Sequence, residues 1–288
     1  MVFFYLVSRI PFPVLYLLSD LFAFLVGPVF GYRRKIIRKN LSRSFPEMPE
    51  HELNKTVRAF YLNFTDVFLE TIKLLTMPDD EIVRRVKINN LEAVNDRLKK
   101  GQSLIALTSH YCNWEWMLAS CSVQFVNPPD AVYLRVKNPF FETLMLKIRS
   151  RFGAYMIEKK YILSEENKRR NEAHVIALVA DQAPVGERSL KWLNFLNQET
   201  PFINGPERIS KILDLPVVYG KMSRIKRGYY EMEFVDVKPE PGPVTGMPVT
   251  EKFGAILEET IREYPPNWLW SHNRWKRARQ TEKEPVTD

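Results

Sequence analysis

The stretch SLIALTSHYCNWE, residues 103–115, decides the fold. Its apolar run, residues 104–107, is typical of a strand that is buried on both faces. Polar residues follow at once, and Asn113 is then suited to cap a helix that begins at Trp114. A buried strand that turns directly into a helix is the unit from which α/β sheets are built. We therefore expect an α/β fold, with this turn at the carboxyl end of a central strand.

The rest of the chain alternates between short apolar runs and helical patterns in the same way. The expected strands cover residues 103–108, 131–135, 175–180, 216–223 and 229–237. The expected helices cover residues 52–75, 114–125, 140–152, 163–172, 206–213 and 250–264. A loop rich in proline should precede the last helix, at Pro239, Pro241, Pro243 and Pro248. This alternation predicts a sheet with crossover helices on both faces.

Composition limits the function without deciding it. The 288 residues are 45% hydrophobic and 12% aromatic, which is ample for a packed core. The formal net charge of +8 favours an anionic partner, either a phospholipid surface, nucleic acid or an acidic protein. Cys112 and Cys121 are too few for a disulfide framework or a four-ligand metal site, so we expect two free structural thiols. The sequence implies no metal and no other cofactor, and it contains no G-x-S-x-G elbow, P-loop or G-x-G-x-x-G turn.

The amino-terminal segment points to a membrane. Residues 1–31 contain only two charged side chains, and the apolar run 14–30 spans roughly 25 Å as a helix against a hydrocarbon core of about 30 Å. Including residues 3–13 makes the segment long enough, so it either spans the bilayer or lies on it. A buried helix of a soluble core is the alternative.

A basic segment follows this apolar one. Between Gly31 and Pro46 there are six basic residues and no acidic one. These charges suit anionic lipid headgroups, and if the apolar segment spans, they place the rest of the chain in the cytoplasm. We therefore expect a membrane anchor with its basic flank at residues 1–45 and a catalytic domain at residues 46–288.

His110 and Glu115 are the candidate catalytic pair in the turn after the central strand. A carboxylate bonded to one imidazole nitrogen fixes the tautomer, so that the other nitrogen can take a proton. Residues five apart on a continuous helix differ by about 140° in direction, so the pair requires His110 to lie on the turn before the helix. The sequence predicts His110 as a general base that Glu115 orients.

The chain resembles the late acyltransferases of lipid A biosynthesis, of the lauroyl/myristoyl type, within the lysophospholipid acyltransferase superfamily. The likeness rests on the His-x4-Glu motif and on five segments in the family's order: the amino-terminal anchor with its basic flank, residues 133–139, residues 180–182, residues 195–206 leading into 215–217, and residues 266–276. The resemblance implies a glycerolipid acyltransferase-like fold, with a central mixed sheet flanked by helices and an N-terminal hydrophobic membrane helix. It also implies a bacterial inner-membrane location with the catalytic domain on the cytoplasmic side.

The same resemblance implies a reaction. A fatty acyl chain would pass from an acyl thioester, of acyl carrier protein or else of coenzyme A, to a hydroxyl of a lipid A precursor, with no acyl-enzyme. Residues expected to bind substrate or the oxyanion are Arg135, Asn138, Asp181, Gln182 and Arg274. A salt bridge at the sheet edge is the alternative for Arg135, and a loop cap is the alternative for the Asp181–Gln182 pair.

Some alternatives stay open. Ala183 and Pro184 follow Asp181–Gln182 where the family usually has a second acidic residue and a glycine, so an aminolipid, a glycolipid or a lysophospholipid is a possible acceptor. A non-catalytic membrane-surface binding protein would share the charge and the aromatic content, whereas the hydrophobic segment argues against nucleic acid. His272 is a rival base without a carboxylate near it in sequence, and its aromatic neighbours alternate like a strand or an interfacial belt.

Overall fold

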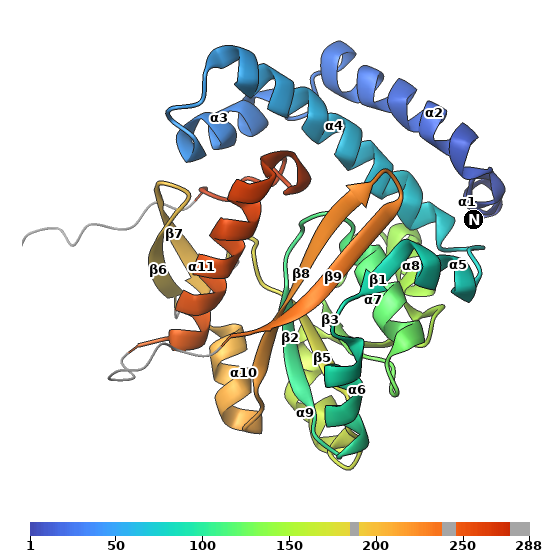
Figure 1. Cartoon of the computed structure of the whole chain (residues 1–288), viewed down its shortest axis with the longest axis vertical. Helices are drawn as coiled ribbons and strands as arrows, with labels where there is room; N and C mark the ends of the chain where they lie inside the picture. Colours follow the sequence, from blue (N-terminus) through green and yellow to red (C-terminus); the bar gives the residue numbers. More distant parts are fainter. Residues whose placement is uncertain (185–189, 238–245, 277–288) are drawn as a thin grey trace, which may run out of the picture.

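The computed structural model describes residues 1–184, 190–237 and 246–276. Its centre is a seven-stranded sheet in the order β1-β9-β8-β2-β5-β3-β4 (Figure 1). Within this sheet the paired strands are parallel except β8 and β9, so the sheet is mixed, as expected. The strands are β1 (Val86–Ile88), β2 (Leu104–Thr108), β3 (Asp130–Tyr133), β4 (Tyr155–Glu158), β5 (Val175–Val179), β8 (Val217–Lys226) and β9 (Tyr229–Asp236).

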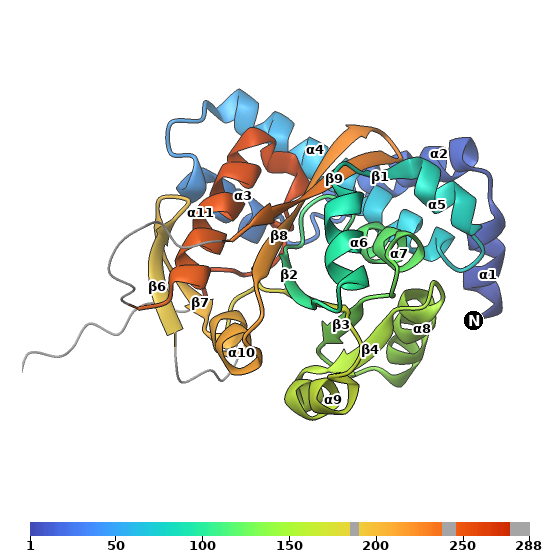
Figure 2. The same ribbon diagram turned by 60° about the horizontal axis from the view of Figure 1, so that its bottom comes forward.

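Helices flank the sheet, and a separate hairpin lies at one end of the molecule. The helices that follow the N-terminal layer are α5 (Asp79–Arg85), α6 (Leu91–Lys99), α7 (Trp114–Gln124), α8 (Pro139–Ser150), α9 (Ile162–Arg169), α10 (Gly205–Leu213) and α11 (Pro248–Glu263). The hairpin of β6 (Leu190–Phe195) and β7 (Gln198–Ile203) packs beside α11, at the end opposite α1 (Figure 2). The predicted α/β class is confirmed.

The pairing of β2 with β5 positions the site. Leu104 lies opposite Val175 and Thr108 lies opposite Val179, so the two parallel strands start and end together. Every residue of β2 is buried, which explains its uninterrupted apolar run. Residues that follow β2 and β5 therefore meet at the same edge of the sheet.

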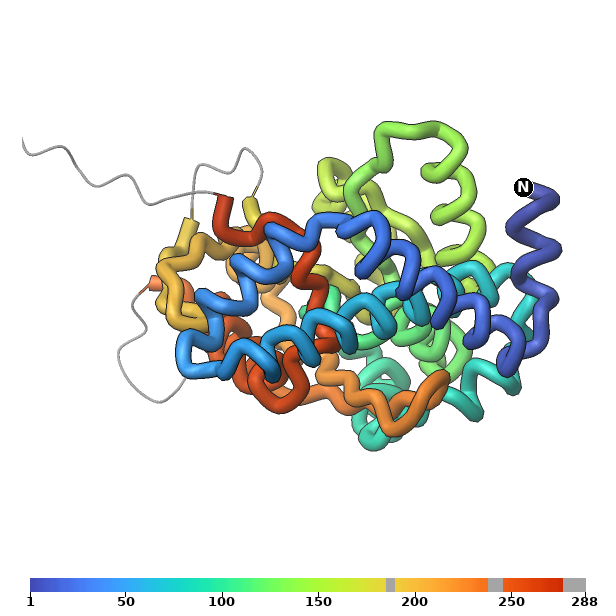
Figure 3. Tube along the Cα trace, turned by 90° about the horizontal axis from the view of Figure 1, so that it is seen from above, coloured from blue at the N-terminus to red at the C-terminus, as the bar shows by residue number. Residues whose placement is uncertain are grey.

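An N-terminal layer covers this carboxyl edge. It consists of α1 (Val2–Arg9), α2 (Phe12–Phe24) with a π-helical turn at Leu25–Val29, α3 (Arg34–Ser44) and the long α4 (Glu50–Lys73). Figure 3 shows α2 lying alongside α4 in the antiparallel direction. The contact is close at Gly27, where a Cβ atom would lie 2.7 Å from the ring of Tyr61. One helical stretch, Phe12–Val29, is long and apolar enough to cross a membrane by length and composition.

Two expectations need comment. The aromatic cluster near the C-terminus is neither a strand nor an interfacial belt, because Trp268 and Trp270 are 3% and 0% exposed. Their rings pack edge-to-face on each other and on Phe195 and Phe45, so the alternation reflects a buried turn. Most of the predicted proline-rich loop, residues 238–245, lies outside the described residues.

A buried ionic cluster holds the opposite, amino-terminal edge of the sheet. His174 precedes β5, and its Nε2 lies 2.8 Å from Glu166 and 3.5 Å from Asp130, while Arg169 Nε lies 3.1 Å from Asp130. The ring's Nδ1 also faces an acceptor, the carbonyl oxygen of Glu172 at 2.8 Å. Three of these groups have the donor types of a metal site, with ligand atoms within 4.8 Å of one another. Arg169, together with His174 when its ring is protonated, supplies positive charge opposite the two carboxylates.

The pKa values in this cluster are shifted upward. Burial alone would lower the pKa of His174, but the bond to Glu166 and the charge of Asp130 outweigh it and raise the pKa above 6.5. Burial raises the pKa of Asp130 to about 6, against the opposing charges of His174 and Arg169. Both groups hold a proton more tightly in the folded state than in the unfolded state.

Replacing His174 should therefore change stability in a pH-dependent manner. A raised folded pKa contributes stability that is present in full below 6.5 and is lost as the pH rises through the folded value. We expect His174→Gln to lower the Tm by a few °C more at about pH 5.5 than at about pH 8.5, measured by thermal unfolding. The exposed His51→Gln variant on α4 is the matched control. A Tm difference for His174→Gln that stays constant between the two pH values would contradict the prediction.

Candidate active site

His110 lies on the turn between β2 and α7, as the spacing argument requires. Asn113 caps α7, because its Oδ1 accepts a hydrogen bond from the backbone N–H of Trp116 at 2.9 Å. Between them, Cys112 adopts a left-handed conformation with φ of 52°, which is uncommon for a residue with a side chain. This sharp turn directs the imidazole out of the strand's line and leaves its side chain 20% exposed.

Asp181, which follows β5, holds His110 at two points. Its Oδ2 accepts the backbone N–H of His110 at 3.0 Å, and its Oδ1 lies 2.8 Å from the ring Nδ1. The indole N–H of Trp268 also donates to Oδ2, at 2.8 Å. Burial would raise the pKa of the Asp181 carboxyl, but the His110 ring and the hydrogen bonds from His110 and Trp268 outweigh it and lower the pKa. Asp181 is therefore an ionised, buried acceptor beside the ring.

This contact fixes the tautomer of His110. A carboxylate only accepts hydrogen bonds, so the ring proton lies on Nδ1 and Nε2 keeps its lone pair. The side-chain amide nitrogen of Gln182 lies 3.2 Å from Nε2 and can donate to it. The structure thus brings Asp181 and Gln182, both predicted for this crevice, onto the two nitrogens of one imidazole.

Glu115 does not contact the imidazole as we predicted. Its carboxylate instead binds Arg149 of α8 through two hydrogen bonds, of 2.6 and 2.9 Å. Burial would lower the pKa of the Arg149 guanidinium, but the bonds and charge of Glu115 outweigh it and raise the pKa. The physical reason is direction, since Glu115 is in the first turn of α7 and faces α8, whereas Asp181 comes from the strand next to β2.

Glu115 still reaches the site through Trp114. The Trp114 indole N–H donates to Glu115 at 3.1 Å, and the Trp114 ring packs edge-on against the His110 ring with centroids 4.9 Å apart. The Glu115–Arg149 pair therefore fixes the wall against which the imidazole rests.

Glu70 of α4 supports the turn from the other side. This fully buried carboxylate accepts hydrogen bonds of 2.7 Å from Asn113, from the Tyr230 hydroxyl and from the Tyr16 hydroxyl of α2. Burial, together with the neighbouring Asp66, raises the pKa of Glu70 despite these donors. The cap of α7 is thereby connected to the N-terminal layer.

The other predicted residues lie farther from the imidazole. Arg135 is exposed just beyond β3, two strands away from β2, which corresponds to roughly 10 Å along the same edge. Asn138 caps α8, with its Oδ1 accepting from the backbone N–H groups of Phe140 and Phe141. Arg274 is 1% exposed, donates to the Pro201 carbonyl at 2.7 Å and lies over the Phe202 ring. Burial lowers the pKa of Arg274 to about 10.

His272 has a structural role here. Its Nε2 accepts a hydrogen bond from the backbone N–H of Ala183 at 3.0 Å. Burial lowers the pKa of His272 to about 4, with Arg274 and His110 adding to the effect against Asp181. An imidazole whose lone pair is already occupied and whose basicity is low is a poor general base.

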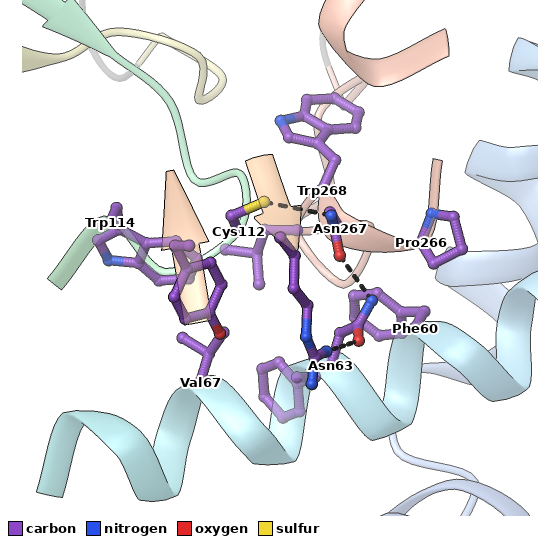
Figure 4. A pocket seen from close by; sticks show the side chains of 12 residues that line it. Phe60, Asn63, Val67, Cys112, Trp114, Pro266, Asn267 and Trp268 are labelled. Carbon is purple, nitrogen blue, oxygen red and sulfur yellow. Dashed lines mark hydrogen bonds between the residues drawn. The ribbon is translucent and has the colours of Figure 1, made fainter. Parts of the chain in front are cut away.

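A small cavity lies behind the turn, between it and α4 (Figure 4). Its volume is about 20 Å³, enough for one water molecule. Figure 4 shows Cys112, Trp114, Phe60 and Asn267 around it, with a hydrogen bond from the Asn267 amide to the Cys112 sulfur of 3.2 Å. Burial raises the pKa of the Cys112 thiol, as it does for Cys121, which does not favour thiolate chemistry.

Sequence reasoning missed three functional neighbours: Arg149, Trp268 and Glu70. Arg149 and Glu70 lie on helices whose packing against α7 no local pattern encodes. Trp268 was noticed for its aromatic character, but only the fold shows that its N–H points at Asp181.

The family model and the similar proteins all point to acyltransferases of lipid A biosynthesis. The model of a family described as bacterial lipid A biosynthesis acyltransferase matches residues 1–277. Lipid A biosynthesis lauroyltransferase of Escherichia coli (strain K12) is 25% identical over 278 residues, which cover 94% of this chain and 88% of that protein. Lipid A biosynthesis palmitoleoyltransferase of the same strain is 22% identical, with coverage of 93% and 87%. Lipid A biosynthesis acyltransferase of Haemophilus influenzae is 22% identical, with coverage of 96% and 88%.

The Glu115–Arg149 pair should show strong coupling in a double-mutant cycle. Glu115→Gln and Arg149→Gln should each lower the free energy of unfolding by up to about 3 kcal/mol, because each leaves a largely buried charge without its partner. The double variant should cost less than the sum of the two, measured by denaturant unfolding. Asp96→Asn, which breaks an exposed pair on α6, is the control and should cost at most about 0.5 kcal/mol. Additive effects at Glu115 and Arg149 would refute the coupling.

Proposed function

We infer the reaction from one premise: the chain belongs to the bacterial lipid A biosynthesis acyltransferase family, whose model matches residues 1–277. The chain is accordingly an acyltransferase. The two Escherichia coli relatives are a lauroyltransferase and a palmitoleoyltransferase of lipid A biosynthesis. We propose that this chain moves a fatty acyl group from an acyl thioester to a hydroxyl of a lipid A precursor.

His110 is the general base in this proposal. Its Nε2 takes the proton of the acceptor hydroxyl as the hydroxyl oxygen attacks the thioester carbonyl, with the hydroxyl replacing the Gln182 amide at that nitrogen. The tetrahedral intermediate then expels the thiolate, which takes the proton back from the imidazolium. The ionised Asp181 stabilises that imidazolium, and no acyl-enzyme forms. The observation that carries the proposal is this geometry, a partly exposed imidazole whose Nδ1 is held by a buried carboxylate.

Two arginines supply positive charge at different distances. We assign Arg135, which is exposed at the same edge of the sheet, to the oxyanion or to an anionic group of the acceptor. We assign Arg274 to the support of the site, because it is buried and the charge of Asp181 acts on its guanidinium. Asn138 contributes indirectly, by capping the helix that follows Arg135.

The donor and the location follow from charge and from the N-terminal layer. A net charge of +8 suits the acidic surface of acyl carrier protein, so we favour its thioester over that of coenzyme A. The basic segment after the apolar one suits the anionic headgroups of the inner membrane, and we place the catalytic domain on its cytoplasmic side. We propose that residues 1–45 act as the membrane anchor and residues 46–288 as the acyltransferase domain.

Replacing His110 tests the reaction directly. His110→Ala should lower acyl transfer from an acyl carrier protein thioester to a lipid A precursor by about 10²–10⁴-fold, since the base is removed. His51→Ala, on the exposed face of α4, is the control. In cells without the gene, mass spectrometry should show lipid A lacking one acyl group, restored by the wild type and by His51→Ala but not by His110→Ala.

The two experiments test different parts of the proposal, namely the mechanism and the identity of the acceptor. Full activity of His110→Ala would overturn the mechanism. Unchanged lipid A in cells without the gene, with an acyl group missing from another lipid, would overturn the acceptor but leave the mechanism standing.

Replacing Asp181 tests how the base is held. In Asp181→Asn the amide can donate to Nδ1, which moves the ring proton to Nε2 and removes the base. We expect kcat to fall by about 10²–10⁴-fold, with KM and the Tm changed little. Asp96→Asn, which makes the same change from a carboxylate to an amide at an exposed position, is the control. A decrease in Tm that accounts for the lost activity would show that Asp181 acts only on folding.

A further inference from the structure

The outward surface formed by α1, α2 and the start of α8 is apolar. Exposed side chains of these helices, together with Leu134 in the segment between β3 and α8, form what we call the apolar face: Val2, Phe3, Leu6, Val14, Leu17, Leu21, Phe24, Leu134, Phe140 and Phe141. Leu17 and Phe3 are 69% and 68% exposed, which is unusual for side chains of this size in water. An exposed apolar surface of this kind marks a site that another molecule or a membrane buries.

The three elements are in contact with one another. The rings of Phe4 in α1 and Phe140 in α8 have centroids 5.8 Å apart, and Lys147 of α8 lies over the ring of Tyr5 at 5.2 Å. Figure 3 shows α1 beside α8 and α2 continuing from it across the same side of the molecule. The apolar face is thus one surface, assembled from segments more than a hundred residues apart in sequence.

Cations surround the apolar face. Arg135 and Lys137 are exposed within the segment that leads to α8. At the far end of α2 the chain enters a concave surface lined by Gly31, Arg33, Arg34, Lys35, Ile36 and Arg38. Apolar side chains bordered by exposed basic ones match a bilayer that contains anionic headgroups. A lipid surface is therefore the partner that both features fit.

The helix with the right length for a span is fastened to the catalytic body. Leu15 and Ser19 of α2 are 0% exposed, and the Ser19 hydroxyl donates to Asp66 of α4 at 2.6 Å. Tyr16 donates to Glu70, as described above. Phe12, at the start of α2, packs under the Arg85 guanidinium at 3.6 Å. One face of α2 is therefore part of the domain's core.

A charge at the middle of this helix also opposes a span. Asp20 lies near the centre of the candidate stretch Phe12–Val29 and pairs with Arg227, from the β8–β9 turn, at 2.7 Å. Arg227 binds Asp66 as well, at 2.6 Å. A spanning α2 would carry Asp20 to the centre of the hydrocarbon, where a carboxylate is costly. If α2 crossed the bilayer while still packed on α4, then α4 would enter the bilayer as well, together with its exposed Arg58.

We propose that the described part of the chain is monotopic: α1, α2 and the start of α8 lie in one leaflet's interface by the apolar face, and the candidate stretch Phe12–Val29 does not cross the bilayer. This proposal rests on the proposed function only in assuming that the acceptor is a lipid. This placement puts the carboxyl edge of the sheet, with His110 and Arg135, next to the headgroup layer. An acceptor hydroxyl can then reach the imidazole without leaving the membrane.

Cysteine labelling in sealed membrane vesicles tests the topology. Arg9 precedes α2, whereas Lys99 lies in the catalytic body at the end of α6, and both are exposed. A monotopic chain has both on one side, so Arg9→Cys and Lys99→Cys should react with a membrane-impermeant maleimide in the same vesicle orientation. The parent chain is the control, because its two cysteines are buried. Labelling of Arg9→Cys and Lys99→Cys from opposite sides, each in a different vesicle orientation, would overturn the proposal.

A fluorescent probe tests the α8 part of the face. With a nitrobenzoxadiazole label, Phe141→Cys should show a several-fold rise and a blue shift in emission when vesicles of phosphatidylethanolamine and phosphatidylglycerol are added. Lys99→Cys with the same label is the control and should not respond. A silent probe at position 141 on bound protein would remove α8 from the interface. Neither readout measures acyl transfer, so their failure leaves the proposed reaction intact.

Discussion

One buried carboxylate organises the site. Asp181 accepts the backbone N–H of His110 and faces its ring Nδ1, so the same group fixes where the turn lies and which nitrogen of the ring is free. This is possible only because β2 and β5 are paired in register and end together. A slip of one residue would turn Asp181 to the other face of the sheet and leave the imidazole without its partner. The register of β2 against β5 therefore decides whether His110 has its carboxylate partner.

The C-terminal segment completes that constraint. Leu269 donates to the His110 carbonyl, Cys112 donates to the Asn267 carbonyl, and Tyr111 forms a bridge with Trp268. These bonds satisfy the backbone of a turn whose left-handed residue would otherwise be unfavourable. A segment more than a hundred and fifty residues away thus holds the catalytic turn in shape.

The sequence showed local structure better than it showed partners. The apolar runs of β2 and β5 and the cap at Asn113 could be predicted, because strand burial and helix capping depend on neighbouring residues. The partner of His110 could not, because a motif suggests Glu115 while strand order, which no local pattern contains, supplies Asp181. The burial of Trp268 and Trp270 could not be predicted for a similar reason, since aromatic and polar residues alternate in the same way in a buried turn and at a membrane interface.

The three donors of Glu70 have a consequence for how the chain can be divided. One donor, Tyr16, belongs to the helix that a biochemist would remove first to make the protein soluble. Without Tyr16 the Glu70 carboxylate would lose one of its three hydrogen bonds and become exposed to solvent, next to Asn113, which caps α7. An inactive soluble fragment would then say nothing about whether the enzyme needs lipid, because the cut itself would have disturbed the catalytic turn.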